Sequence, residues 1–276
     1  MNVPFYDAVR EYNNYKKEFD NAISDVLTSG AFILGKQVQS FEEAICRYTG
    51  AKYAIGVANG SDALVIASDI LDYKNDLEVL TPVFTFFAST SCIARLNGKP
   101  VFCDVSENTF CMNMKDAENR ITKKTTGILP VHLFLQTADM TACMRMAEKH
   151  NLTVLEDAAE AFGMKTNYKG VNCHAGTIGD FGIFSFFPTK TLGGYGDGGM
   201  IITNNEELYK KAKYYRTHGA VQKYYHDYIG YNSRLDTLQA AILQVKLSHI
   251  DESIRRREKH ALHYYNSLND NSGISI

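Results

Sequence analysis

The sequence has no run of about 18 apolar residues, and its first ten residues include acidic and polar side chains where a signal peptide would be apolar. We therefore expect neither a membrane span nor a secretory signal. Excess charge is also missing, because 29 basic and 31 acidic residues give a formal net charge of -2. Without a basic field, nucleic acid is not an expected partner. The run Arg255 to Arg257, flanked by Glu252 and Glu258, is interpreted as a solvated helix face.

None of the six cysteines forms a CxxC pair. This spacing predicts neither a disulfide framework nor a metal site, so we expect reduced thiols and a cytoplasmic protein. The sequence also has no internal repeat and no low-complexity segment. What is present is ordinary for a soluble globular enzyme: 276 residues, 45% of them hydrophobic and 22% charged.

Helical periodicity alternates with short apolar runs along the chain. Residues 12–28 and 37–48 carry apolar side chains at helical spacing and predict paired amphipathic helices. Seven runs predict strands: 53–57, 78–81, 100–104, 127–131, 153–156, 181–186 and 199–203. Helical patterns between most of them indicate an α/β fold with one large, mostly parallel sheet. In such sheets, ligands bind beyond the carboxyl ends of the strands.

The chain after residue 205 has a helical pattern. Helices are expected over residues 206–216, 236–247 and 251–268. The segment 271–276 has the pattern of the start of a further strand. We therefore expect the end of the chain to be incomplete.

Lys190 lies between an aromatic strand and a loop with five glycines in the seven positions 193–199. A lysine that forms a Schiff base must be held away from bulk water, beside backbone small enough to admit a flat heterocycle and its phosphate. Ser185 and the glycines meet those needs. The alternative is an ordinary surface lysine beside a glycine-rich turn.

Two further strand ends supply complementary groups. The segment 58–64, ANGSDAL, has the pattern of a strand end, a glycine turn and a helix start, whose free N–H groups would bind a phosphate. Asp157 ends another strand, where a carboxylate would pair with a protonated ring nitrogen. The alternatives are a plain helix cap at the first position and an internal ion pair at the second.

An aromatic loop, TPVFTFFA at residues 81–88, follows the second predicted strand. One of its rings is expected to stack on the cofactor face. Since core packing is the default for any phenylalanine, one of Phe86 and Phe87 is expected to be buried.

Seven motifs in order resemble the DegT/DnrJ/EryC1/StrS sugar aminotransferases, which are pyridoxal-phosphate enzymes of the aspartate-aminotransferase type (fold type I). They are GAFILG at 30–35, ANGSDAL at 58–64, TPVFTFFAS at 81–89, PVHLFLQTADM at 130–140, EDAAEAFG at 156–163, FSFFPTKTLGGYGDGG at 184–199 and GYNSRLDTLQAAIL at 230–243. The resemblance implies a large domain over residues 1–250, with a seven-stranded sheet between helices. Residues 251–276 would be a linking helix and the start of a small C-terminal domain that is largely missing.

The resemblance also implies site roles. Lys190 would carry pyridoxal 5'-phosphate as a Schiff base, and Asp157 would contact its ring nitrogen. Phe86 would stack on the ring, and Glu160 would face its hydroxyl. The phosphate would be held by Gly60, Ser61, Asp62 and Ser185, and Asn232 would reach the phosphate of the neighbouring subunit. A homodimer with shared active sites follows.

Three features depart from the family pattern. Glu160 stands where many relatives carry Gln, and it would change the hydrogen bond to the cofactor. Leu135 replaces a Gly and would add bulk near the cofactor, whereas His132 and Gln136 keep their family identities. Relatives usually continue for about a hundred residues that close over the substrate.

The implied reaction moves an amino group from L-glutamate to a nucleotide-linked keto-sugar, with Lys190 as proton shuttle. The loop PTKTLGGYGDGG favours amination at C3 over C4. A dTDP-linked 6-deoxyhexose and a UDP-linked N-acetyl hexuronate both stay open. Related deoxysugar dehydrases carry His in place of this lysine, so Lys190 argues against dehydration. A cofactor-binding regulator or inactive homologue is the alternative outside enzymes.

Overall fold

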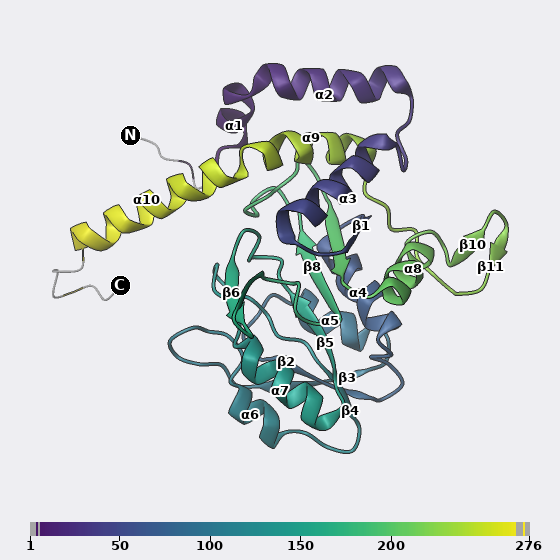
Figure 1. Ribbon diagram of the computed structural model, residues 1–276, viewed down its shortest axis with the longest axis vertical. Coiled ribbons are helices and arrows are strands. Elements are labelled where there is room, and N and C mark those ends of the chain that lie inside the picture. Colours follow the sequence, from purple (N-terminus) through teal and green to yellow (C-terminus); the bar gives the residue numbers. More distant parts are fainter. Residues whose placement is uncertain (1–3, 5, 269–272, 274–276) are drawn as a thin grey trace.

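The computed structural model describes residues 4, 6–268 and 273 and has three layers, with a central sheet covered by helices on both faces (Figure 1). The sheet has the strand order β1-β9-β8-β5-β4-β2-β3. Its strands are β1 (Tyr53–Val57), β2 (Glu78–Pro82), β3 (Lys99–Cys103), β4 (Thr125–Ile128), β5 (Thr153–Asp157), β8 (Phe181–Ser185) and β9 (Gly199–Thr203). Only β9 runs antiparallel to its neighbours, β1 and β8.

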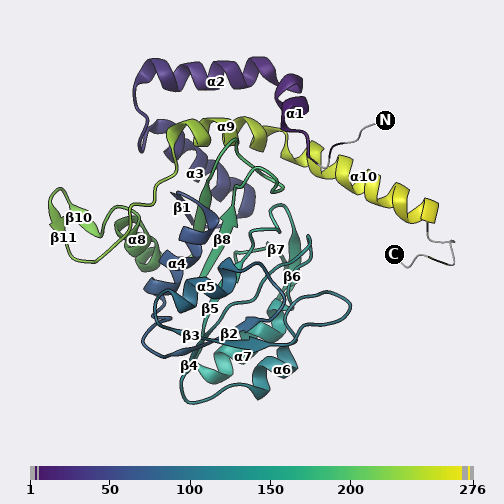
Figure 2. The same ribbon diagram turned by 180° about the vertical axis from the view of Figure 1, so that it is seen from behind.

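Helices on the first face of the sheet are α4 (Gly60–Ile70), α5 (Ala88–Ala94) and α8 (Glu206–Tyr215). The second face is covered by α3 (Lys36–Thr49), α6 (Met114–Asn119), α7 (Met140–His150) and α9 (Thr237–Ser248). The remaining helices are α1 (Ala8–Asn14), α2 (Lys16–Ser29) and α10 (Ile250–Leu268). Viewed from behind, α10 extends from the end of α9 away from the sheet (Figure 2).

Successive side chains along each strand point to opposite faces of the sheet and so contribute to the hydrophobic cores on its two sides. Leu155 of β5 packs with the α4 side, whereas Val154 packs with the α7 side. In β9, Ile201 faces α4 and Met200 faces the opposite cluster with α3 and α9. Because most of the strands are buried on both faces, they are largely apolar and were recognisable as short apolar runs.

The expected α/β architecture is therefore confirmed, and all seven predicted strands belong to the sheet. The single helix expected over residues 12–28 is wrong in detail, since the chain leaves helical geometry at Tyr15 between α1 and α2. The expected pairing of the first helices is also corrected, because α2 and α3 each pack against α9. Two hairpins were not predicted: β6 (Lys165–Tyr168) with β7 (Val171–His174), and β10 (Ala220–Gln222) with β11 (Tyr225–His226). The segment 271–276, expected to start a strand, lies outside the described residues except for Gly273.

A nearly buried ion pair ties α8 to α3 and to the edge strand β1. Arg216 donates to Glu42 Oε1 at 2.5 Å and to the carbonyl oxygen of Gly56 at 3.0 Å. The same carboxylate oxygen accepts the N–H of Gly56 at 2.8 Å. The side chains of Arg216 and Glu42 are only 8% and 16% exposed, so each charge depends on the other.

Arg216→Ala is expected to lower the free energy of unfolding by about 3 kcal/mol, because it leaves Glu42 buried without its counter-ion. Urea denaturation would measure this loss. Arg120→Ala is the matched control, since Arg120 pairs with Asp116 at the surface and its removal should cost less than about 1 kcal/mol. Equal losses in the two variants would contradict the importance given to burial here.

Candidate active site

A cavity of about 660 Å³ opens beyond the carboxyl ends of β5 and β8, against the N-terminus of α4. Eight of the nine residues predicted from the sequence to bind the cofactor line it. They are Gly60, Ser61, Asp62, Phe86, Asp157, Glu160, Ser185 and Lys190. The structure thus brings together residues that span 130 positions of the sequence, at the edge of the sheet where chemistry was expected.

Lys190 lies in the loop after β8, and its side chain is 22% exposed. Its Nζ donates to Glu160 Oε1 at 3.1 Å. The second oxygen of Glu160 accepts the N–H of Phe134 at 3.3 Å, which ties this carboxylate to the loop after β4. Lys190 is therefore held inside the cavity by a carboxylate and is not the freely solvated surface lysine of the alternative interpretation.

Asp157 is the buried end of β5. Its Oδ2 accepts from the Ser89 hydroxyl at 2.7 Å, and its Oδ1 accepts the N–H of Ala159 at 3.1 Å. Burial raises the pKa of this carboxyl above its ordinary value, partly offset by the hydrogen bonds from Ser89 and Ala159 and by the charge of Lys190. A cation placed against Asp157 would reverse that shift, so the position suits a protonated ring nitrogen.

The start of α4 provides an anion site. The Asn59 side chain caps the helix by accepting the N–H of Asp62 at 2.7 Å. Helical geometry leaves the N–H groups of Gly60 and Ser61 without intrahelical acceptors, and the helix dipole adds positive potential there. Gly60 also lies so close to β8 that a Cβ would be 2.7 Å from the Cβ of Ser185. This narrow cradle, with two hydroxyl groups beside it, fits a phosphate.

Gly60→Ala is expected to lower the free energy of unfolding by about 1–3 kcal/mol, because the added methyl group forces α4 and β8 apart. Affinity for pyridoxal phosphate should fall in parallel, since the same displacement opens the cradle. Urea denaturation and cofactor titration measure the two effects. Ser61→Ala is the control: Ser61 is exposed, so this change should weaken cofactor binding and leave stability within about 0.5 kcal/mol. A Gly60→Ala protein as stable as the wild type would contradict the steric argument.

The aromatic loop differs from expectation. Phe86 and Phe87 are 74% and 75% exposed, so the prediction that one of them is buried in the core is wrong. The chain turns directly into α5 here, with Phe87 at its N-cap, and this short helix directs both rings away from the core. Phe86 lines the cavity.

The structure also shows where Leu135 and Asn232 lie relative to the cavity. Leu135 has a φ of 61°, a left-handed conformation that explains why Gly suits this place. Its side chain is 42% exposed and is not among the described residues that line the cavity, so the added bulk expected there is absent. Asn232 is exposed, follows the β10–β11 hairpin and also lies outside the cavity lining. Its neighbour Ser233 accepts the N–H of Ala58 and so anchors this segment beside α4.

Sequence reasoning missed several residues of the site. Ser89 was not singled out, although it holds Asp157, and it is itself 2.9 Å from the Thr85 hydroxyl. Thr85 and Arg95 also line the cavity. The spacing of Thr85 and Ser89, four residues apart around a helix start, was the available signal, but Asp157, the partner of Ser89, lies far along the chain on β5.

Behind Asp157 lies a buried polar cluster. His132 Nδ1 accepts the N–H of Ala138 at 3.0 Å, so the ring carries its proton on Nε2, which donates to Glu156 at 2.9 Å. Glu156 also accepts backbone N–H groups from the loop 176–179. The carboxylate of Glu156 is thus fully occupied, consistent with a neighbour of the reacting groups.

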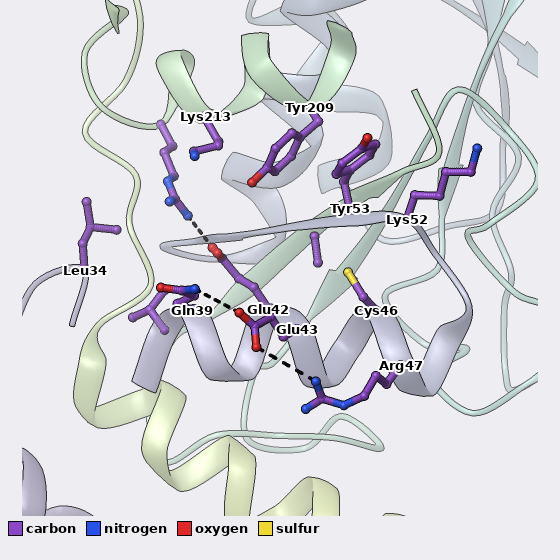
Figure 3. A pocket seen from close by; sticks show the side chains of 13 residues that line it. Leu34, Gln39, Glu42, Glu43, Cys46, Arg47, Lys52, Tyr53, Tyr209 and Lys213 are labelled. Atoms are coloured by element: carbon purple, nitrogen blue, oxygen red, sulfur yellow. Dashed lines mark hydrogen bonds and ion pairs between the residues drawn. The ribbon is translucent and has the colours of Figure 1, made fainter. Parts of the chain in front are cut away.

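A second cavity, of about 680 Å³, lies between α3, β1 and α8 (Figure 3). Arg216 donates to Glu42 of α3, whereas Glu43 pairs with Arg47 and accepts from Gln39 along α3 itself. Most of its charges are therefore paired with each other. None of the predicted site residues lines it.

The sheet, the cavity and the lysine opposite a buried carboxylate define the class: a pyridoxal-phosphate-dependent enzyme fold of the aspartate-aminotransferase type. A family profile described as the DegT/DnrJ/EryC1/StrS aminotransferase family matches residues 13–276. The chain belongs to this family, which is dependent on pyridoxal phosphate.

Three curated relatives illustrate the similarity. The chain is 47% identical to the "Pleiotropic regulatory protein" of Geobacillus stearothermophilus, over 99% of this chain and 72% of that protein. It is 41% identical to the UDP-2-acetamido-2-deoxy-3-oxo-D-glucuronate aminotransferase of Pseudomonas aeruginosa, over 96% and 73%. It is 37% identical to the dTDP-3-amino-3,4,6-trideoxy-alpha-D-glucose transaminase of Streptomyces venezuelae, over 99% and 71%.

Solved structures of aminotransferases are also similar to this chain. A DegT DnrJ EryC1 StrS aminotransferase from Brucella abortus superposes with a TM-score of 0.93 at 34% identity, over 98% of this chain and 73% of that one. NtdA from Bacillus subtilis, solved with bound cofactor PMP, superposes with a TM-score of 0.88 at 31% identity, over 97% and 61%. None of the helices in the described part of the chain combines the length and the apolar character that a membrane span requires.

Proposed function

We propose that this chain is an aminotransferase that uses pyridoxal phosphate to move an amino group from L-glutamate to a nucleotide-linked keto-sugar. One observation carries the proposal: Lys190, Asp157 and the N-terminus of α4 line a single cavity at the carboxyl ends of the strands. Each supplies what one part of the cofactor needs, namely an amine, a carboxylate and a phosphate cradle.

Each residue of the site would contact a different part of the cofactor. Gly60, Ser61 and Ser185 would hold the phosphate, and Asp157 would hold the ring nitrogen protonated. When bound, the cofactor supplies an electron-withdrawing ring that stabilises negative charge on the substrate carbon. The exposed ring of Phe86 would cover one face of it and exclude water.

Lys190 would also move the proton. Its free amine would act as a general base and then as a general acid at the reacting carbon. Glu160 is the described carboxylate within hydrogen-bonding distance of Lys190 Nζ, at 3.1 Å, and positions that amine. In this chain Glu160 fills the place where many relatives carry Gln, so the lysine contacts a carboxyl group in place of an amide.

The names of the relatives favour a 3-keto sugar as acceptor. The P. aeruginosa relative is named for a 3-oxo-glucuronate on UDP, and the S. venezuelae relative for a 3-amino-trideoxyglucose on dTDP. Both nucleotides therefore belong to the proposal. It also includes a homodimer in which Asn232 reaches the partner's cofactor, and action in the cytoplasm.

A regulatory role is the second candidate, because the relative from G. stearothermophilus is named as a regulatory protein. Binding of cofactor without catalysis would need no amine poised for proton transfer. Lys190 and its contact with Glu160 favour the enzyme.

The test is the absorbance spectrum of the 276-residue protein with pyridoxal phosphate, before and after L-glutamate. A band of covalently bound cofactor that shifts to the amine form on adding glutamate is expected. Screening UDP- and dTDP-linked 3-keto sugars would then identify the acceptor. A bound cofactor that glutamate leaves unchanged would favour the regulator.

A further inference from the structure

We propose that a basic cleft beside Lys190, formed by α1 and the α9–α10 junction, binds the diphosphate of the nucleotide sugar. This inference rests on the proposed function. The cleft has a volume of about 380 Å³ and is bounded by residues 6–15, 188–191 and 246–260. Lys190 lines both this cleft and the cofactor cavity, so one residue borders the two spaces.

The charges of the cleft do not cancel. Arg10, Lys246, Arg256 and Arg257 line it, together with two histidines, against the carboxylates Asp7 and Glu11. Lys246 is buried and pairs with Glu11 at 2.6 Å. This pair therefore uses one of the two carboxylates.

Two arginines are left without counter-ions. Asp7 accepts the backbone N–H of Arg10 at the start of α1, and Arg256 pairs with Glu252. Neither the guanidinium of Arg10 nor that of Arg257 forms an ion pair within the described part of the chain. Burial and the charge of Arg257 both lower the pKa of Lys246, although Glu11 raises it. The cleft is therefore electropositive.

The position of the cleft beside Lys190 and its positive charge indicate which part of the substrate it binds. Guanidinium groups bind phosphate oxygens in a bidentate manner, and two of them suit a diphosphate. In a nucleotide sugar, only a few covalent bonds separate the carbon that receives the amino group from the diphosphate. A sugar held at Lys190 would place its diphosphate in the adjoining cleft.

The run Arg255 to Arg257 is exposed on α10, as expected for a solvated helix face. Arg256 and Arg257 line the cleft, whereas Arg255 is not among its lining residues. All three are exposed on the same helix. Arg255 is thus a matched control for the loss of one positive charge.

Isothermal titration calorimetry with UDP and with dTDP, on the cofactor-loaded 276-residue chain, tests the proposal. The double variant Arg10→Ala/Arg257→Ala is expected to weaken binding of the diphosphate at least about tenfold, because hydrogen bonds between charged groups are stronger than neutral ones. Arg255→Ala should stay within about twofold of the wild type, since a remote surface charge is screened. Thermal melts confirm that each variant is folded.

Equal affinities in the double variant and the wild type would overturn the proposal. So would a wild-type protein that binds neither diphosphate although L-glutamate converts its cofactor. Conversely, arginine-dependent binding of UDP or dTDP supports the cleft even if glutamate leaves the spectrum unchanged. That last result would refute the proposed transamination alone.

Discussion

Lys190→Ala is expected to remove covalent cofactor attachment and to lower turnover by at least about 10²–10⁴-fold, the range typical of a lost general acid–base group. The structure explains the size of this effect. Nζ of Lys190 faces the cavity and is positioned by Glu160 at 3.1 Å. A methyl group could neither bind the aldehyde of the cofactor nor transfer a proton.

Borohydride reduction followed by peptide mass spectrometry measures attachment independently of activity. The wild-type protein should carry the reduced cofactor on the peptide that contains Lys190, and the variant should carry none. Lys169→Ala is the control, because Lys169 lies in the β6–β7 hairpin with a side chain that is 67% exposed. Glutamate-dependent turnover that persists in Lys190→Ala would refute the mechanism.

The fold was predictable because most of its strands are buried on both faces. Runs such as Tyr53–Val57 and Gly199–Thr203 are apolar over most of their length and match the observed strands residue for residue. Register and direction were not encoded in any single run. That β9 runs antiparallel between β1 and β8 depends on how the long loop with Lys190 returns across the sheet.

The hairpins escaped prediction for a physical reason. Strand β6 alternates exposed and half-buried residues and carries Lys165 and Asn167, so its sequence has no apolar run. The β10–β11 hairpin pairs over only a few residues and exposes Tyr224 and Tyr225. Such pairs are stabilised by cross-strand contacts, which a local pattern does not reveal.

For the candidate site, likewise, the sequence predicted individual residues but not the contacts between them. Lys190, Asp157 and Ser61 could be chosen because each follows a recognisable strand or begins a helix. The contacts that hold them could not, since Ser89 is 68 positions from Asp157 and Glu160 is 30 positions from Lys190. Those contacts depend on the strand order, which places β2, β4, β5 and β8 side by side.

Asp157→Asn is expected to lower turnover by about 10²–10³-fold, comparable to the loss of one preorganised electrostatic group. The amide is nearly isosteric and can keep the local hydrogen bonds. Its oxygen can accept from Ala159, and its nitrogen can donate to the Ser89 hydroxyl, which can then donate to Thr85. The fold should therefore persist while the negative charge opposite the ring nitrogen is lost.

Without cofactor, the same change should stabilise the protein as pH rises. Because burial raises the pKa of Asp157 in the folded state, the stability associated with its neutral form is present below the ordinary carboxyl range, about 3.9, and is lost as pH rises through the raised value. The amide introduced by Asp157→Asn does not ionise, so the melting temperature of the cofactor-free variant should exceed that of the wild type by a margin that grows with pH. Adding pyridoxal phosphate should reverse the order, since the cationic ring compensates the wild-type carboxylate. Differential scanning calorimetry with and without cofactor measures both effects, and a variant less stable than the wild type at every pH would assign Asp157 a structural role only.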